Sequence, residues 1–155
     1  MPANEPVLWK IQESLETDIN AIAAGSGYYY TASNVEGRSN IPQDQVPGYF
    51  IVGLAGVTNA PEETQGRYYW VASFDIVATV AHSSNLTDDQ ARARLFADIQ
   101  KAVMANPKRT LSAVDYAIDS RVLAPDIQDQ YDERTGITVP VEVHYRTLVS
   151  DPTTT

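Results

Sequence analysis

Strict alternation of side chains over residues 68–82 constrains the fold of this chain more than any other feature of its sequence. An apolar residue at every second position is typical of a β-strand, because successive side chains point to opposite faces of a sheet. One face would carry Tyr68, Trp70, Ala72, Phe74, Ile76, Ala78, Val80 and His82. The pattern covers about 15 residues, whereas strands usually contain about 5–6. Such a strand must bend or project past its sheet, and a projecting strand offers its edges to another chain.

Four further segments have the composition of strands. Residues 28–31 are short and aromatic, residues 49–54 form a hydrophobic run that suits a central strand, and residues 114–119 alternate. The last segment, residues 137–149, alternates between an apolar face and a charged face. Pro140 on the charged face indicates an edge position or a bulge, because proline has no N–H to donate to a ladder.

Two segments have helical periodicity. The first helix is predicted over residues 7–24, where Pro6 suits the first turn. Its apolar stripe consists of Ile11, Leu15, Ile19 and Ile22. The second helix is predicted over residues 86–104, because Thr87 and Gln90 have the spacing of a capping box.

The order of these segments predicts an α+β fold. A helix separates two strands only at residues 87–105, so antiparallel pairing is favoured. We therefore expect an antiparallel or mixed β-sheet with two amphipathic helices packed on one face. The length suits a single domain over residues 1–155, with a frayed tail at residues 151–155.

Long polar segments are predicted as loops at residues 33–48 and 125–136, with a shorter turn-rich loop at residues 59–66. Loops beyond about 12–15 residues are uncommon in compact domains and often bind partners. The segment at residues 33–48 is therefore a candidate functional element, with a solvated surface excursion as the alternative.

Composition excludes several classes of function. The chain has 20 acidic and 11 basic residues, a formal net charge of −9, which argues against a sequence-independent grip on nucleic acid. It has no cysteine, which excludes a disulfide scaffold, a thiol nucleophile and thiolate-based metal sites. We see no signal peptide and no apolar run near the roughly 20 residues of a membrane helix, so we expect a soluble protein made inside the cell.

No motif in the chain points to catalysis. A nucleophile elbow and a phosphate-cradling loop are both missing, and Asp115 and Asp119 would lie about 13 Å apart along one strand face, too far for a glycosidase pair. His82 ends an apolar face and His144 lies between two charged residues, so we expect partnered histidines. The acids of residues 126–133 could bind Ca²⁺ but lack the EF-hand spacing. We expect no catalytic residue, no metal site and no cofactor.

Aromatic residues cluster in several parts of the chain. They are Tyr28, Tyr29, Tyr30, Tyr49, Phe50, Tyr68, Tyr69 and Trp70. Stacking on nucleobases would need basic neighbours, which these residues lack. Packing in the core or at an interface is favoured, because Tyr and Trp are enriched where a buried face meets another chain. Tyr68, Tyr69 and Trp70 are therefore candidate subunit-interface residues.

The arrangement of elements over residues 7–152 resembles that of a known family. It comprises a leading amphipathic helix, the long strand Tyr68–His82, the capped helix start Leu86–Ala91, and a closing strand Val143–Thr147. In this order it is similar to the tail terminator proteins of long-tailed bacteriophages, also called minor tail protein U-like or tail-to-head joining proteins.

The resemblance implies an α+β fold and a non-catalytic structural protein of the virion. Such a protein forms a homohexameric ring at the head-proximal end of the tail tube, ends tail elongation and joins the tail to the neck. The implied partners are further copies of the chain, the tail tube protein and a neck or connector protein. DNA passes through the lumen without specific binding, and neither a cofactor nor a membrane is involved. The implied location is the tail and neck of the virion, after assembly in the host cytoplasm.

Charge acquires a role under this resemblance. Six copies would together carry six times the charge of one chain, about −54. Acidic groups that line the bore would keep DNA from sticking as it passes. The candidates for axial contacts or the lumen are the acids on predicted loops: Asp44, Glu62, Glu63, Asp126, Asp129, Asp132 and Glu133.

Two other classes of protein remain open. One is another completion or stopper ring of the phage neck. The other is an unrelated small α/β ligand-binding domain or enzyme, in which Asp75 or His144 would line a deep pocket.

Overall fold

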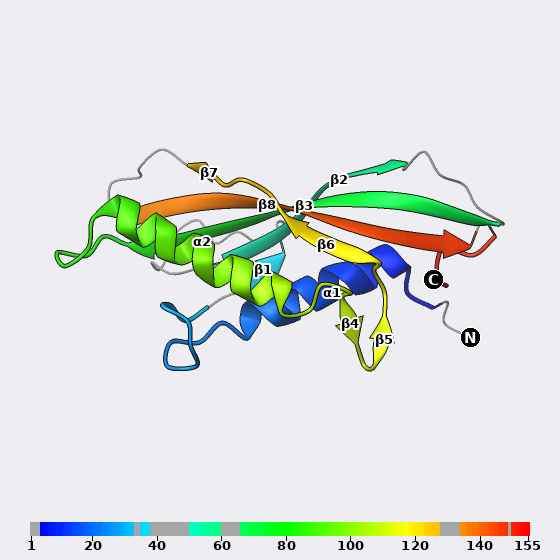
Figure 1. The fold of residues 1–155 in the computed structure, drawn as a ribbon, viewed down its shortest axis with the longest axis horizontal. Coiled ribbons are helices and arrows are strands. Elements are labelled where there is room, and N and C mark those ends of the chain that lie inside the picture. The colour runs from blue at the N-terminus through cyan, green and yellow to red at the C-terminus, as the bar shows by residue number, and fades with distance from the viewer. Residues whose placement is uncertain (1–3, 33–34, 38–49, 60–65, 128–133, 149) are drawn as a thin grey trace.

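The computed structural model describes all residues except 1–3, 33–34, 38–49, 60–65, 128–133 and 149. The described residues form two helices, a six-stranded sheet and a small hairpin, so the predicted α+β class is confirmed (Figure 1). The helices are α1 (Val7–Asn20) and α2 (Asp88–Met104). The strands are β1 (Val35–Gly37), β2 (Phe50–Asn59), β3 (Arg67–Ala81), β4 (Thr110–Leu111), β5 (Val114–Asp115), β6 (Asp119–Val122), β7 (Asp126–Ile127) and β8 (Arg134–Leu148).

The sheet is built around one long antiparallel pair. β3 and β8 have 15 residues each and pair along their whole length, from Arg67 opposite Leu148 to Ala81 opposite Arg134. The strand order is β1–β2–β3–β8–β6, with β7 also paired to β8 and only β1 and β2 parallel. The long strand predicted over residues 68–82 is confirmed with a shift of one residue. At about 3.3 Å per residue, this pair is about 50 Å long.

Both helices cover the same face of the sheet (Figure 1). The predicted stripe of α1 is fully or almost fully buried, and the alternating apolar faces of β3 and β8 close the core against it. Burial of each large aliphatic side chain contributes about 1.5–3 kcal/mol, so this shared core holds the two layers together. Its largest fully buried apolar members include Ile11, Leu15, Ile19, Ile22, Phe50, Phe74, Ile76, Leu95, Ile99 and Ile137.

The start of α2 is confirmed as a capping box. The Thr87 side chain accepts a hydrogen bond from the Gln90 backbone N–H, and the Gln90 side chain accepts one from the Thr87 N–H. α1 ends at Asn20, earlier than the predicted residue 24. The chain turns there through Gly25 and Gly27, whose φ angles of 91° and 86° favour glycine.

The predicted strand at residues 28–31 is wrong. Asp98 of α2 is 2% exposed, and its carboxylate accepts hydrogen bonds from the backbone N–H groups of Tyr29 and Tyr30 at 2.9–3.0 Å. The Lys101 ammonium donates to the Gly27 carbonyl oxygen at 2.7 Å. Side chains of α2 therefore take the backbone groups that a sheet ladder would have used.

The strand predicted over residues 114–119 is divided in two. β5 pairs with β4 in a hairpin whose turn has positive φ at Ser112 and Ala113, whereas β6 joins β8 in the main sheet. Between them, the Ala117 N–H donates to the Lys108 carbonyl oxygen. The alternation is real, but its two halves belong to different sheets.

Pro140 lies inside the sheet, not at its edge, because β8 pairs with β3 on one side and with β6 and β7 on the other. The Pro140 carbonyl accepts from Leu123, which immediately follows β6. Pro140 therefore lies opposite the gap between β6 and β7. No residue of either strand needs the backbone N–H that proline lacks at this position.

A buried arginine joins α1 to the end of α2. Arg109 is fully buried, its guanidinium lies 3.0 Å from the Asp18 carboxylate, and it donates to the carbonyl oxygens of Val103 and Asn106. Burial lowers the pKa of Arg109 to about 10, while the charge of Asp18 acts in the opposite direction. Burial also raises the pKa of the Asp18 carboxyl. No sequence pattern indicated this pair.

Candidate functional site at one end of the sheet

One end of the long sheet extends beyond the amino end of α1 (Figure 1). We call this end the arm and define it as residues 54–59 of β2, 67–72 of β3 and 143–148 of β8. Its strands β3 and β8 keep their antiparallel register to the end of the sheet, where Arg67 lies opposite Leu148. The arm has the projection that the length of β3 predicted.

Among the described residues, the outer edge of β2 is open along the arm. β1 pairs only with residues 50–52, and within the described part of the chain no strand pairs with the outer side of β2 from Gly53 to Asn59. A bulge between Leu54 and Gly56 interrupts the register with β3. Leu54 and Val57 are each 38% exposed on this strand. An edge with exposed apolar side chains is suited to pairing with another chain.

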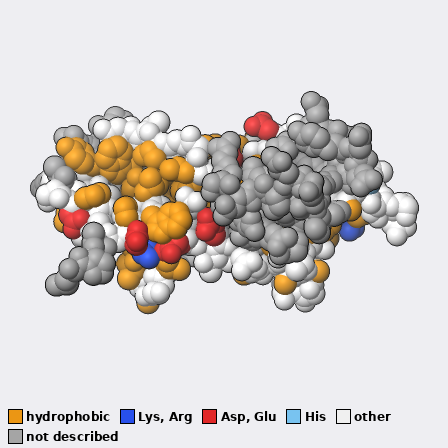
Figure 2. Space-filling view, turned by 180° about the vertical axis from the view of Figure 1, so that it is seen from behind, with side chains coloured by type: hydrophobic (Ala, Val, Ile, Leu, Met, Phe, Trp, Pro, Cys, Tyr) orange, Lys and Arg blue, Asp and Glu red, His pale blue; other side chains and the backbone are white. Residues whose placement is uncertain are grey.

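An apolar groove of about 340 Å³ lies beside this edge, on the helix side of the sheet. Its walls are formed by Pro6, Leu8, Val57, Trp70, Tyr145, Thr147 and Pro152. Figure 2 shows hydrophobic side chains gathered over this end of the molecule. The groove joins the start of α1, the arm and the carboxyl-terminal segment.

Trp70 is the central aromatic residue of the groove. Its indole N–H donates to the Thr147 hydroxyl at 3.1 Å. The ring of Tyr68 packs edge-on against the indole ring, with the two ring centroids 5.8 Å apart. Burial raises the pKa of Tyr145 in the same wall. The polar atom of Trp70 is thus satisfied inside the protein, and its apolar ring contributes to the groove.

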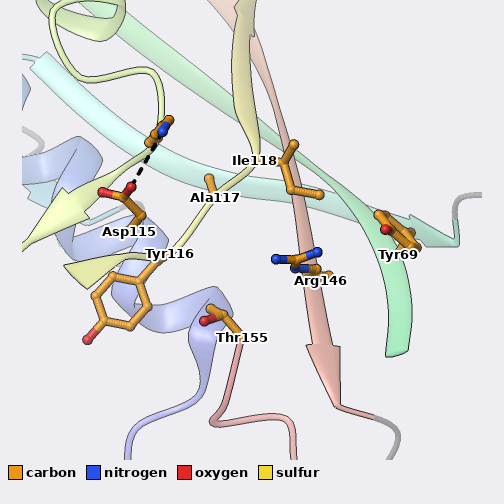
Figure 3. Close-up of a pocket in the computed structure, with 8 residues that line it drawn as sticks. Tyr69, Asp115, Tyr116, Ala117, Ile118, Arg146 and Thr155 are labelled. Atoms are coloured by element: carbon orange, nitrogen blue, oxygen red, sulfur yellow. Dashed lines mark ion pairs between the residues drawn. The ribbon is translucent and has the colours of Figure 1, made fainter. Parts of the chain in front are cut away.

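A second cavity, of about 420 Å³, lies at the β8 side of the arm, beyond the amino end of β6 (Figure 3). We call it the notch. It is lined by Tyr69, Lys108, Asp115, Tyr116, Ala117, Ile118, Arg146 and Thr155. On one wall Asp115 lies 3.7 Å from the Lys108 ammonium and accepts from the Thr110 hydroxyl at 2.6 Å. Arg146 extends from β8 toward that wall (Figure 3).

The structure brings together only some of the predicted interface residues. Tyr68, Tyr69 and Trp70 all lie on the arm, Tyr68 and Trp70 on the helix side and Tyr69 at the notch. Asp126 is exposed on β7, near the opposite end of the sheet (Figure 1). The remaining candidates, Asp44, Glu62, Glu63, Asp129, Asp132 and Glu133, lie outside the described residues.

The sequence analysis did not predict the second half of β2. It also did not predict that the amino-terminal and carboxyl-terminal segments of the chain line the groove. The predicted strand stopped at residue 54, because the two glycines and the small residues after it gave no apolar period. The apolar residue Val57 was the only local signal of the arm's open edge.

A Thr–His–Asp cluster lies at the other end of the sheet. The Nδ1 of His82 lies 2.8 Å from the Asp88 carboxylate, and the buried Thr135 hydroxyl donates to the same carboxylate at 2.7 Å. The hydrogen bond from Thr135, followed by that of His82, lowers the pKa of Asp88. Because the hydroxyl is buried and donates to the acid, the cluster ties α2 to the sheet and presents no nucleophile.

The other histidine has a weaker contact. The Nε2 of His144 lies 3.8 Å from the Glu142 carboxylate on the same strand face, and this buried atom has no hydrogen-bond partner among the described residues. Within the described residues, no group of three or more His, Asp or Glu side chains could hold a metal ion. No described helix is long and apolar enough to cross a membrane.

No protein-family model matches the chain, and no curated protein is significantly similar to it in sequence.

Proposed function

We propose that this chain is a non-catalytic structural subunit of a ring, most simply a hexamer, at the head-proximal end of a phage tail tube. The ring would end tube elongation and join the tail to the neck. The arm carries this proposal, because its β2 edge is open among the described residues and its groove exposes apolar surface beside that edge. Pairing between copies around a closed ring would cover such an edge on every subunit.

Fold and charge support the same proposal. Two helices on one face of a long antiparallel sheet agree with the arrangement that the resemblance implies. A chain of net charge −9 is suited to a conduit that DNA must traverse without binding.

Native mass spectrometry combined with negative-stain imaging tests the proposal. We expect a ring of six copies, either in solution or on purified tail tubes. Added to growing tubes, the protein should bind one end and shorten the distribution of tube lengths. A stable monomer that neither binds tubes nor alters their length would contradict the proposal.

The same preparation separates the alternatives. Another neck ring would bind filled heads in preference to tail tubes. For an enzyme or ligand-binding domain, a pocket lined by Asp75 or His144 was expected, and neither residue lines the groove or the notch. A monomer with measurable turnover would favour that class.

A further inference from the structure

Arg146 is one of two cations, with Arg67, whose described side chains have no opposite charge within ion-pair distance among the described residues. Five other cations form ion pairs: Lys10 with Glu13, Arg92 with Asp89, Lys108 with Asp115, Arg109 with Asp18, and Arg121 with Asp119. Arg94 and Lys101 lie over the rings of Tyr29 and Tyr28. Among the cations whose side chains are described, Arg67 and Arg146 remain without an acidic or aromatic partner within the described residues.

The notch gives Arg146 a place to bind an anion. Its side chain is half-buried and is directed into the space between β8 and the segment that carries Tyr116 and Ala117 (Figure 3). The one acidic side chain in the notch, Asp115, is already engaged by Lys108 and Thr110. A planar guanidinium in a partly enclosed cavity is suited to two parallel hydrogen bonds with a carboxylate.

A second copy of the chain is the complementary partner. With 20 acids to 11 bases, another copy presents mainly carboxylates to any positive site. Asp126 is exposed on β7 and has no basic side chain within ion-pair distance among the described residues. It pairs in the sheet with Thr138, eight residues before Arg146, so the two positions lie about 26 Å apart along β8. They cannot meet within one chain.

We infer that the notch of one copy binds the Asp126 carboxylate of the next copy through Arg146. The two positions lie toward opposite ends of the molecule, so the contact is head-to-tail. Such a contact repeats from copy to copy and closes into a ring when its rotation allows. This inference rests on the proposed ring and assigns one of the contacts that would hold it together.

A charge-swap cycle in the full chain tests the inference. We would measure assembly by sedimentation velocity and native mass spectrometry for the wild type, Arg146→Glu, Asp126→Arg, and the double variant Arg146→Glu/Asp126→Arg. Each single variant should weaken assembly at least tenfold, because it places like charges opposite each other. The double variant should restore assembly to within about threefold of the wild type.

Arg67→Glu is the matched control. Arg67 also has no acidic or aromatic partner among the described residues, lies at the same end of the sheet and undergoes the same change of charge, but it does not line the notch. We expect its assembly to remain within about threefold of the wild type. Thermal melts establish that every variant is folded. Arg146→Gln, measured in the same assembly assay, removes the positive charge without reversing it.

Three results would overturn the inference. If the double variant does not recover assembly, Asp126 is not the group that binds in the notch. If Arg67→Glu and Arg146→Glu lose assembly equally, the loss comes from the change in net charge and not from a contact of Arg146. Binding of duplex DNA that Arg146→Glu abolishes would assign the notch to phosphate. If the wild type assembles and the swap fails, only this contact is wrong; if no copy assembles even on tail tubes, the proposed function fails as well.

Discussion

At the scale of single residues, buried polar side chains decide the path of the chain around α2. Asp98 accepts hydrogen bonds from the backbone of Tyr29 and Tyr30, and Arg109 holds the end of α2 against α1 through Asp18. Each of these two contacts buries polar or charged groups and replaces their hydrogen bonds to water with hydrogen bonds inside the protein. Loss of one partner leaves the other buried and unsatisfied, which costs more than the contact itself contributes.

Asp98→Ala should therefore destabilise the protein by about 3 kcal/mol, because the N–H groups of Tyr29 and Tyr30 lose their acceptor. Asp98→Asn keeps one acceptor oxygen and should lose less. Chemical denaturation of both variants measures the difference. An alanine variant as stable as the asparagine variant would contradict the role given to the carboxylate.

Asp88 predicts a specific dependence of stability on pH. Hydrogen bonds from Thr135 and His82 lower its pKa in the folded state below the ordinary value of 3.8. Its stabilising effect is thus complete above about pH 4 and is lost as the pH falls through the lowered pKa. Asp88→Asn should lower the Tm at pH 7 and have a smaller effect near pH 2.

Asp89→Asn is the control for this pH series. Asp89 also lies in the first turn of α2, but its side chain is 92% exposed. It shares the interaction with the helix dipole and lacks the bonds to the sheet. Equal pH profiles for the two variants would mean that the dipole, and not the Thr135 and His82 bonds, stabilises Asp88.

At the scale of elements, the long strands and the capped helix follow from local patterns, whereas the arm depends on how strands are placed together. β3 and β8 extend as far as their alternation does. β2 contributes to the arm only because β3 continues beside it after the bulge. Its open edge depends on three strands, because β3 extends along β2 as far as Asn59 while β1 pairs only with residues 50–52.

Leu54→Lys and Val57→Lys test the arm as an assembly surface. Both side chains are 38% exposed, so the folded monomer should keep a Tm within a few degrees of the wild type. A charge on an open strand edge opposes pairing with another chain, so assembly should fall at least tenfold. Sedimentation velocity measures this loss.

Met104→Lys is the matched control for the arm variants. Met104 is 43% exposed at the carboxyl end of α2, where a cation is favoured by the helix dipole. Its assembly should equal that of the wild type. Equal loss in all three lysine variants would remove the arm from the interface.

At the scale of the whole molecule, one apolar core connects the two helices to the sheet. The buried cluster includes residues of α1, β2, β3, α2 and β8 without a division into separate groups. We expect the wild-type monomer to unfold in a single transition, because the buried residues of both helices belong to this one core. Coincident curves from circular dichroism and tryptophan fluorescence would agree with this, and two separate transitions would contradict it.

The sequence by itself determined the elements whose signal is local. The stripe of α1, the capping box at Thr87 and the alternation of β3 and β8 each depend on residues close together in the chain, and each is present in the structure. The fold class followed from their order.

Only the tertiary structure decided which distant residues meet. Asp98 lies 69 residues from Tyr29, and that contact replaced a predicted strand with a turn. The notch around Arg146 and the open edge of β2 likewise depend on where neighbouring strands stop. Periodicity specifies which side chains face inward along one element, but register and strand order are set by packing of the whole core, so the surfaces left for a partner appear only after folding.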